Sequence, residues 1–378
     1  MEGRETGQAA SVIDADGHVW EPEEAWEQHL DPAFLDRRPR IVLDDRQTSR
    51  YLIEDRLMPP GTGRAAWAPE GFREASLHRP GGVDPAARLV DMDTDGIDVA
   101  VLYGTLALGL WSIRDLDLQV ACCRAFNDWL AEYCATDPVR LRAAAALPFG
   151  SIDAAVAEAD RAVTRLGAVV LTIPGSVLGR NLDDPALFPL YETAERLDVP
   201  LGVHAGGTGL AIDRFVDQYA MAHACAFPMD IMLGATTLLC GGVLERFPRL
   251  RVALLEAGCG WFPAFLERLD EHFEKRPGEM PKLTRPPSAF VEEGRVVISC
   301  EPEEHGIRYA AERLGAGAVI YASDYPHWDA EFPGSVAAIR DREDLDAVTR
   351  RAILGDNARR LLGARFEQVS VLAERGPQ

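Results

Sequence analysis

Short apolar and β-branched runs alternate along the chain with longer segments of helical period. Near-continuous apolar strands are typical of parallel sheets, which are buried on both faces. Segments of helical period, such as 113–135, 151–167 and 185–197, separate the runs. The alternation predicts an α/β fold, a (β/α)8 TIM barrel. Its eight expected strands are SVIDAD (11–16), DVAVLY (98–103), LRAAAALPF (141–149), AVVLTIP (168–174), PLGVHA (200–205), RVALLEA (251–257), RVVISCE (295–301) and AVIYASD (318–324).

One domain spanning 1–378 accounts for this pattern, because barrels of this type often exceed 250 residues. An insertion at about 38–83 follows the first strand and predicts a small hairpin and then a Pro/Gly-rich loop. We expect it to overhang the barrel mouth, since it leaves the C-terminal end of a strand. A second excursion, 206–249, follows the fifth strand, and its helix is expected to wall the pocket.

Charge and composition narrow the choice of partners and compartment. The 378 residues include 39 basic and 60 acidic side chains, a formal net charge of -21 that repels nucleic acid and anionic lipid. No apolar stretch is long enough to span a membrane, and the first residues lack the apolar segment of a signal peptide. Seven cysteines without paired spacing indicate reduced thiols. We therefore expect a cytoplasmic protein that binds neither nucleic acid nor membrane.

Acidic residues and histidines gather at the ends of the expected strands. Asp16 and His18 close the first strand, where positions i and i+2 point to the same side. His204 closes the fifth strand and Asp324 the eighth, with His327 just beyond it. A solvated strand end would explain one Asp-x-His triplet, and a lone histidine is more often a core residue. Together they predict a metal site of nitrogen and oxygen ligands at one barrel face.

The ordered blocks SVIDADGHVWEPEEAW, 241–271 and ASDYPHWD resemble the amidohydrolase superfamily. The resemblance covers nearly the whole chain and is to the amidohydrolase-related branch with aminocarboxymuconate-semialdehyde decarboxylase and gamma-resorcylate decarboxylase. It implies one divalent metal ion, held by Asp16, His18, His204 and Asp324. It also implies decarboxylation of an aromatic or unsaturated carboxylic acid, with Asp324 as proton donor, and a homodimer or higher homo-oligomer.

Two positions depart from that family's pattern. Many relatives begin with His-x-His or Glu-x-His, whereas Asp16 is a harder oxygen ligand that shifts the preference from zinc toward manganese, with magnesium a third option. Where the decarboxylases carry a histidine after strand six, this chain has Glu256. Glu256 would be a general base if burial raised its pKa, or a structural carboxylate paired with Arg251 or Arg268.

Further residues near the expected ligands form a candidate substrate pocket. Its aromatic and imidazole members would stack against a flat substrate, or would only plug the barrel rim. Glu301, beyond strand seven, is expected to line the pocket or to begin an acidic helix. The other members of the candidate pocket are Trp20, His223, Phe227, Trp261 and Trp328.

Three functions remain open from the sequence. Decarboxylation is the first. The second is metal-dependent hydrolysis, hydration or cyclisation of an amide, an ester or a natural-product precursor, with Glu256 or Asp324 as base and His327 or His223 stabilising the oxyanion. The third is a non-catalytic barrel that binds a small molecule, against which a complete ligand set argues.

Overall fold

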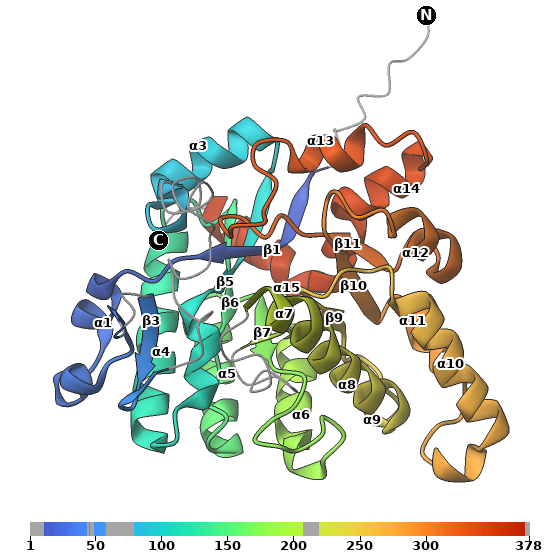
Figure 1. Ribbon diagram of the computed structural model, residues 1–378, viewed down its shortest axis with the longest axis horizontal. Helices are drawn as coiled ribbons and strands as arrows, with labels where there is room; N and C mark the ends of the chain where they lie inside the picture. Colours follow the sequence, from blue (N-terminus) through green and yellow to red (C-terminus); the bar gives the residue numbers. More distant parts are fainter. Residues whose placement is uncertain (1–10, 44, 46–48, 58–78, 207–218, 375–378) are drawn as a thin grey trace, which may run out of the picture.

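Eight parallel strands form the centre of the molecule in the computed structural model, which describes residues 11–43, 45, 49–57, 79–206 and 219–374. The sheet follows chain order, and the residues of all eight strands are buried (Figure 1). The predicted (β/α)8 barrel is confirmed. Its strands are β1 (Ile13–Val19), β5 (Val99–Gly104), β6 (Leu141–Ala145), β7 (Val170–Ile173), β8 (Leu201–Val203), β9 (Val252–Leu254), β10 (Val296–Cys300) and β11 (Val319–Tyr321).

Helices follow the strands and surround them (Figure 1). Side-chain caps fix several helix starts: Asp84, Asp115 and Ser151 each accept a hydrogen bond from a first-turn backbone N–H. The helices between strands are α3 (Pro85–Asp95), α4 (Leu116–Cys134), α5 (Ile152–Arg165), α6 (Phe188–Leu197), α8 (Phe227–Cys240), α9 (Val243–Arg246), α10 (Phe262–Lys275), α11 (Ser288–Glu292) and α12 (Ile307–Leu314). After β11 come α13 (Ser335–Arg340), α14 (Ala347–Arg351) and α15 (Asn357–Glu374).

The insertion after β1 begins with α1 (Glu23–His29) and then forms a small antiparallel sheet. Its strands are β2 (Arg40–Leu43), β3 (Ser49–Ile53) and β4 (Arg56–Leu57), so the predicted hairpin carries a third short strand. Tyr51 of β3 is buried against Gly109, where an added Cβ would lie 2.9 Å from the ring. The small sheet therefore packs on the 3-10 helix η3 (Leu106–Ser112), which follows β5. The loop expected at 58–78 lies outside the described residues.

The second excursion contributes a helical wall. Helix α7 (Tyr219–Met221) and the π-helical turn η6 (Ala222–Ala226) lead directly into α8. Within the described residues, the run Ala222–Cys240 is the one helix long and apolar enough to cross a membrane, and 44% of that window is buried inside the protein. Its buried side chains, among them Ile231 and Leu238, belong to the hydrophobic core. The seven cysteines are free thiols, five of them buried.

Arg88 of α3 joins the first and last strands from beneath the barrel mouth. It is 1% exposed and donates to the carbonyls of His18 at 2.8 Å and Tyr325 at 3.4 Å. Its guanidinium lies 4.4 Å from the Tyr325 ring centroid and 3.8 Å from the Asp14 carboxylate. Backbone hydrogen bonds from His18 N to Tyr325 O, 2.7 Å, and from Asp324 N to Asp16 O, 3.1 Å, complete this seam. Arg88 thus holds together the two segments that carry most of the candidate ligands.

We expect Arg88→Met to lower the free energy of unfolding by about 3–5 kcal/mol, because it leaves Asp14 and two carbonyls buried without their cation. Denaturant unfolding followed by circular dichroism measures the change. The matched control is Arg340→Met, since Arg340 is exposed and pairs with its neighbour Asp341; that change should fall within about 0.5 kcal/mol. Equal effects of the two substitutions would contradict the role of Arg88.

Candidate metal centre

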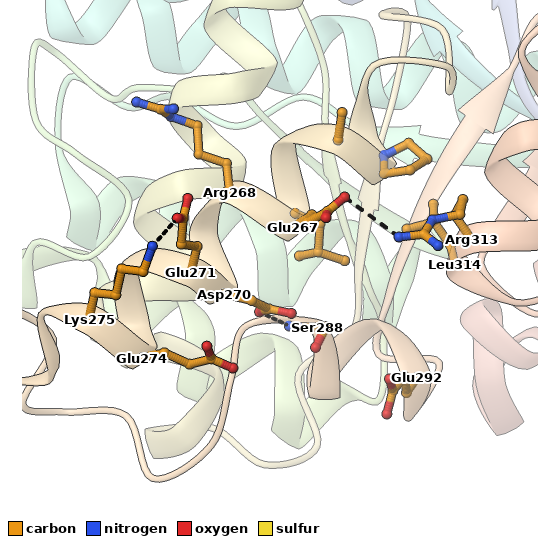
Figure 2. Close-up of a pocket in the computed structure, with 13 residues that line it drawn as sticks. Glu267, Arg268, Asp270, Glu271, Glu274, Lys275, Ser288, Glu292, Arg313 and Leu314 are labelled. Atoms are coloured by element: carbon orange, nitrogen blue, oxygen red, sulfur yellow. Dashed lines mark hydrogen bonds and ion pairs between the residues drawn. The ribbon is translucent and has the colours of Figure 1, made fainter.

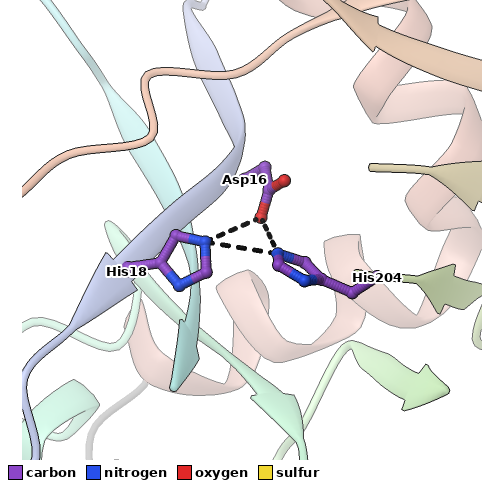
Figure 3. A group of neighbouring side chains, drawn as sticks. All are labelled: Asp16, His18 and His204. Carbon is purple, nitrogen blue, oxygen red and sulfur yellow. Dashed lines mark hydrogen bonds and ion pairs between the residues drawn. The ribbon is translucent and has the colours of Figure 1, made fainter. Parts of the chain in front are cut away.

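Asp16, His18 and His204 meet at the barrel mouth (Figure 3). The first two project from β1, and His204 directly follows β8. The Nε2 atoms of the two imidazoles are 3.3 Å apart, and Asp16 Oδ1 lies 3.5 Å from each of them. All three side chains are almost completely buried. The barrel therefore brings three electron-rich atoms into contact in a site shielded from water.

The surroundings of the two rings leave their Nε2 lone pairs available. His18 Nδ1 donates to the Gly104 carbonyl at 3.3 Å, and His204 Nδ1 donates to the Ala205 carbonyl at 2.6 Å. A neutral imidazole with a protonated Nδ1 has its lone pair on Nε2, which is the atom that binds metal. Asp16 Oδ1 is buried without a hydrogen-bond partner. These donors fit a divalent cation, which would satisfy all three at once.

The charges around Asp16, His18 and His204 favour a positive charge between these three side chains. Burial raises the pKa of Asp16, and burial together with the neighbouring imidazoles lowers the pKa of His18 well below its usual value. Burial also opposes the charged form of His204, but the carboxylates of Asp16 and Glu256 outweigh it and raise the pKa of His204 to about 10. The carboxylates thus stabilise a cation at this point of the barrel.

Asp324, which follows β11, supplies a fourth candidate ligand beside the same Nε2 atom of His18. Its Oδ1 lies 3.5 Å from His18 Nε2 and 2.6 Å from His327 Nδ1, and its side chain is 19% exposed. Burial, reinforced by Asp329 and Glu256, raises the pKa of Asp324 well above its usual value. Both Asp324 and Glu256 have left-handed backbones, with φ of 53° and 52°. Such strained non-glycine residues occur at functional sites, where the fold holds a side chain in place.

Glu256 follows β9 and faces two histidines rather than an arginine. Its Oε2 lies 3.2 Å from His204 Nδ1, and its Oε1 lies 3.8 Å from His223 Nε2. Burial favours a raised pKa for Glu256, but the positive charges of His204 and His223 outweigh burial, so the pKa is lowered. The raised pKa that would make Glu256 a general base is therefore not found. Arg251 instead pairs with Asp198 at 2.8 Å. The Arg251 pairing is not found either, and Glu256 lies between His204 and His223.

The aromatic residues expected around the pocket contact three different places: His327, His223 and the start of α10. Trp20 packs edge-on to His327, with ring centroids 5.6 Å apart. Phe227 and Trp328 both pack on His223, at 4.7 and 6.0 Å. Trp261, the residue before α10, contacts Phe262 and Phe265 of that helix. Trp20 thus lies beside His327, which contacts Asp324, and Phe227 and Trp328 lie beside His223, which faces Glu256. The ring contacts of Trp261 are those of a helix-packing residue.

Glu301 follows β10, on the same side as His223. Partial desolvation by the surrounding protein, together with the charges of Asp329 and Glu304, raises the pKa of its carboxyl group. Asp329 lies 3.8 Å from His223 Nε2 and was not singled out from the sequence. Thr105 was also missed, although its hydroxyl lies 3.0 Å from His327 Nε2. Its place directly after an apolar strand was the one available signal.

A separate surface cleft lies between α10, α11 and α12, with a volume of about 770 Å³ (Figure 2). Its charged side chains pair with one another, as Lys275 does with Glu271 and Arg313 with Glu267. Arg268 lines this cleft, which is how the structure excludes it as the partner of Glu256. The cleft contains none of the candidate metal ligands.

Fold and site together define a barrel enzyme of the amidohydrolase type. Residues 13–364 match the family model described as amidohydrolase, and the chain belongs to that family. Within it, the chain falls in the branch of 2-amino-3-carboxymuconate-6-semialdehyde decarboxylase and gamma-resorcylate decarboxylase. It is 28% identical to the former from Dictyostelium discoideum over 285 residues, covering 74% of this chain and 77% of the relative. It is 29% identical to the latter from Rhizobium radiobacter over 281 residues, covering 70% and 85%.

A solved structure shows the same fold. The 5-carboxyvanillate decarboxylase from Novosphingobium aromaticivorans superposes with a TM-score of 0.70 at 21% identity, covering 94% of this chain and 96% of that one. That enzyme was crystallised with manganese and a nitrobenzoic acid.

We predict that the purified protein carries about one divalent metal ion per chain and that His204→Ala removes it, because one of four protein ligands is lost. Elemental analysis after gel filtration measures the content. His272→Ala is the matched control, since His272 lies on the exposed part of α10 and donates to the Arg268 carbonyl. Equal metal in the wild type and both variants would exclude this site.

Proposed function

We propose that the protein is a divalent-metal-dependent decarboxylase of an aromatic or unsaturated carboxylic acid. The observation that carries the proposal is the buried contact between Asp16 Oδ1, which has no hydrogen-bond partner, and the two imidazole Nε2 atoms. Decarboxylases among the relatives support the reaction type. Trp20, His223, Phe227 and Trp328 would accommodate a flat substrate beside the metal.

Asp16, His18, His204 and Asp324 would hold the metal. A bound divalent ion would supply positive charge that polarises and orients the substrate carboxylate. The aspartate at position 16 favours manganese, as does the manganese bound by the fold neighbour, with zinc and magnesium as the other candidates. His18 and His204 are presented through Nε2 because backbone carbonyls hold their Nδ1 protons.

Asp324 would deliver the proton. It is the candidate ligand that is open to the barrel mouth, so its carboxyl group could reach both the metal and the reacting carbon. The proton would pass from Asp324 to the carbon that bears the carboxylate. The carbon–carboxylate bond would then break, its electron pair would return to the substrate, and CO2 would leave. Water at the mouth would restore the proton to Asp324.

Glu256 would act on His204 through its charge rather than as a base in this reaction. Its Oε2 lies 3.2 Å from His204 Nδ1, whose proton is directed to the Ala205 carbonyl, so the negative charge of Glu256 would act on a ring that the backbone already orients. Hydrolysis or hydration is the alternative that Glu256 supports, because its other oxygen faces His223 at the mouth and could accept a proton from water. In that case His327 or His223 would stabilise the oxyanion.

A single domain, a cytoplasmic location and a homo-oligomeric assembly remain predictions.

Asp324→Asn should abolish nearly all turnover in a folded protein, because an amide cannot carry the proton although it keeps much of the shape. Released CO2 from a panel of hydroxybenzoic acids measures turnover, and metal analysis of the same samples shows whether the ion is retained. Asp341→Asn is the matched control, since Asp341 is exposed and pairs with its neighbour Arg340 rather than with any residue of the site. Near-wild-type turnover by Asp324→Asn with full metal would remove Asp324 from the mechanism.

Glu256→Gln separates the two chemistries. A decarboxylase should lose no more than about tenfold in kcat, since the Ala205 carbonyl still accepts the Nδ1 proton of His204 and keeps the ring oriented. A hydrolase should lose about 10²–10⁴-fold in kcat with little change in KM, because its base is gone. The substrates are benzoate-type acids assayed for CO2 and aryl amides and esters assayed in parallel. Cleavage of an amide that depends on Glu256, with no acid decarboxylated, would favour the hydrolase.

A further inference from the structure

The end of β5 is connected to the segment after β11 by one side-chain hydrogen bond. Thr105 Oγ1 lies 3.0 Å from His327 Nε2, and His327 Nδ1 lies 2.6 Å from Asp324 Oδ1. We propose that Thr105 is a positioning residue of the active site, whose hydroxyl fixes the ring orientation and tautomer of His327 and thereby the carboxylate of Asp324. This inference rests on the proposed function, in which Asp324 both binds the metal and delivers the proton.

The remaining contacts of the His327 ring do not distinguish its nitrogens from its carbons. The ring stacks on His18 with centroids 4.1 Å apart, and Trp20 meets it edge-on at 5.6 Å. A ring rotated by half a turn would keep both of these packing contacts but would turn carbon atoms toward Thr105 and Asp324. The two hydrogen bonds therefore determine which way the ring faces.

A hydroxyl is suited to this place because it both donates and accepts. When Asp324 is ionised as a metal ligand, it accepts the Nδ1 proton of His327, and Nε2 of the neutral ring accepts from the Thr105 hydroxyl. Thr105 therefore supplies the donor that this ring orientation needs at Nε2.

The backbone around Thr105 is itself held in place. Glu21, only 3% exposed, accepts hydrogen bonds from the N–H groups of Leu106 and Ala107, each at 2.9 Å. A Cβ at Gly104 would lie 2.4 Å from Glu21 Oε1, so the close approach of this carboxylate requires glycine. The Gly104 carbonyl accepts from His18 Nδ1. One anchored segment thus orients both His18, through a carbonyl, and His327, through a hydroxyl.

Two substitutions isolate the hydroxyl. Thr105→Val keeps the shape and removes the hydroxyl, whereas Thr105→Ser keeps the hydroxyl and removes the methyl group. We expect Thr105→Val to lower kcat about 10–100-fold, as losses of groups that orient active-site ligands do, with KM, metal content and thermal midpoint close to the wild type. Thr105→Ser should restore most of the wild-type kcat.

Nitrogen NMR of histidine-labelled, zinc-loaded protein reports the ring directly, with His327→Asn used to assign the signal. We expect a single tautomer of His327 in the wild type and in Thr105→Ser, and a mixture in Thr105→Val. A single tautomer in Thr105→Val with unchanged kcat would overturn the inference, as would equal loss of kcat in both variants. If the wild type decarboxylates none of the acids tested, the proposed function fails, and the NMR comparison still decides the role of Thr105.

Discussion

The burial of three electron-rich atoms within hydrogen-bonding distance of one another is the constraint on which the site depends. Asp16 Oδ1 and the Nε2 atoms of His18 and His204 lie within 3.5 Å and are shielded from water. Their burial removes these atoms from bulk solvent, so the arrangement is costly unless a positive charge, a metal ion or a proton, lies between them. The barrel bears that cost because each of the three atoms is attached to a rigid strand end.

Several groups hold Asp16, His18 and His204 in this unfavourable geometry. The carbonyls of Gly104 and Ala205 orient the two rings, and Glu256 adds a carboxylate to the outer side of His204. Arg88 joins β1 to the segment after β11. The left-handed backbones of Glu256 and Asp324 show that the polypeptide is also strained where these side chains enter the site. Orientation at this mouth is thus imposed by a shell of hydrogen bonds around the ligands.

Membership of the amidohydrolase family accounts for the barrel scaffold. The replacement of the decarboxylases' histidine by Glu256 affects the chemistry available at the barrel mouth. A histidine at this position could exchange a proton with substrate near neutral pH, whereas a carboxylate held between His204 and His223 has a lowered pKa and stays charged. On the other side of the site, Asp324, His327 and Thr105 form a hydrogen-bonded row. In the proposed reaction this row would move the proton, and Glu256 would act only on His204.

The sequence by itself determined the barrel, because eight apolar runs separated by helical segments admit few other arrangements of buried parallel strands. It also placed Asp16 and His18 on one side of β1, since strand periodicity is a local property. Only the tertiary structure decided which distant groups meet. His327 and Thr105 are 222 positions apart, and Glu256 meets His204 and His223 instead of either arginine considered for it. Barrel closure and the left-handed turns after β9 and β11 set these contacts, and neither leaves a periodic signal along the chain.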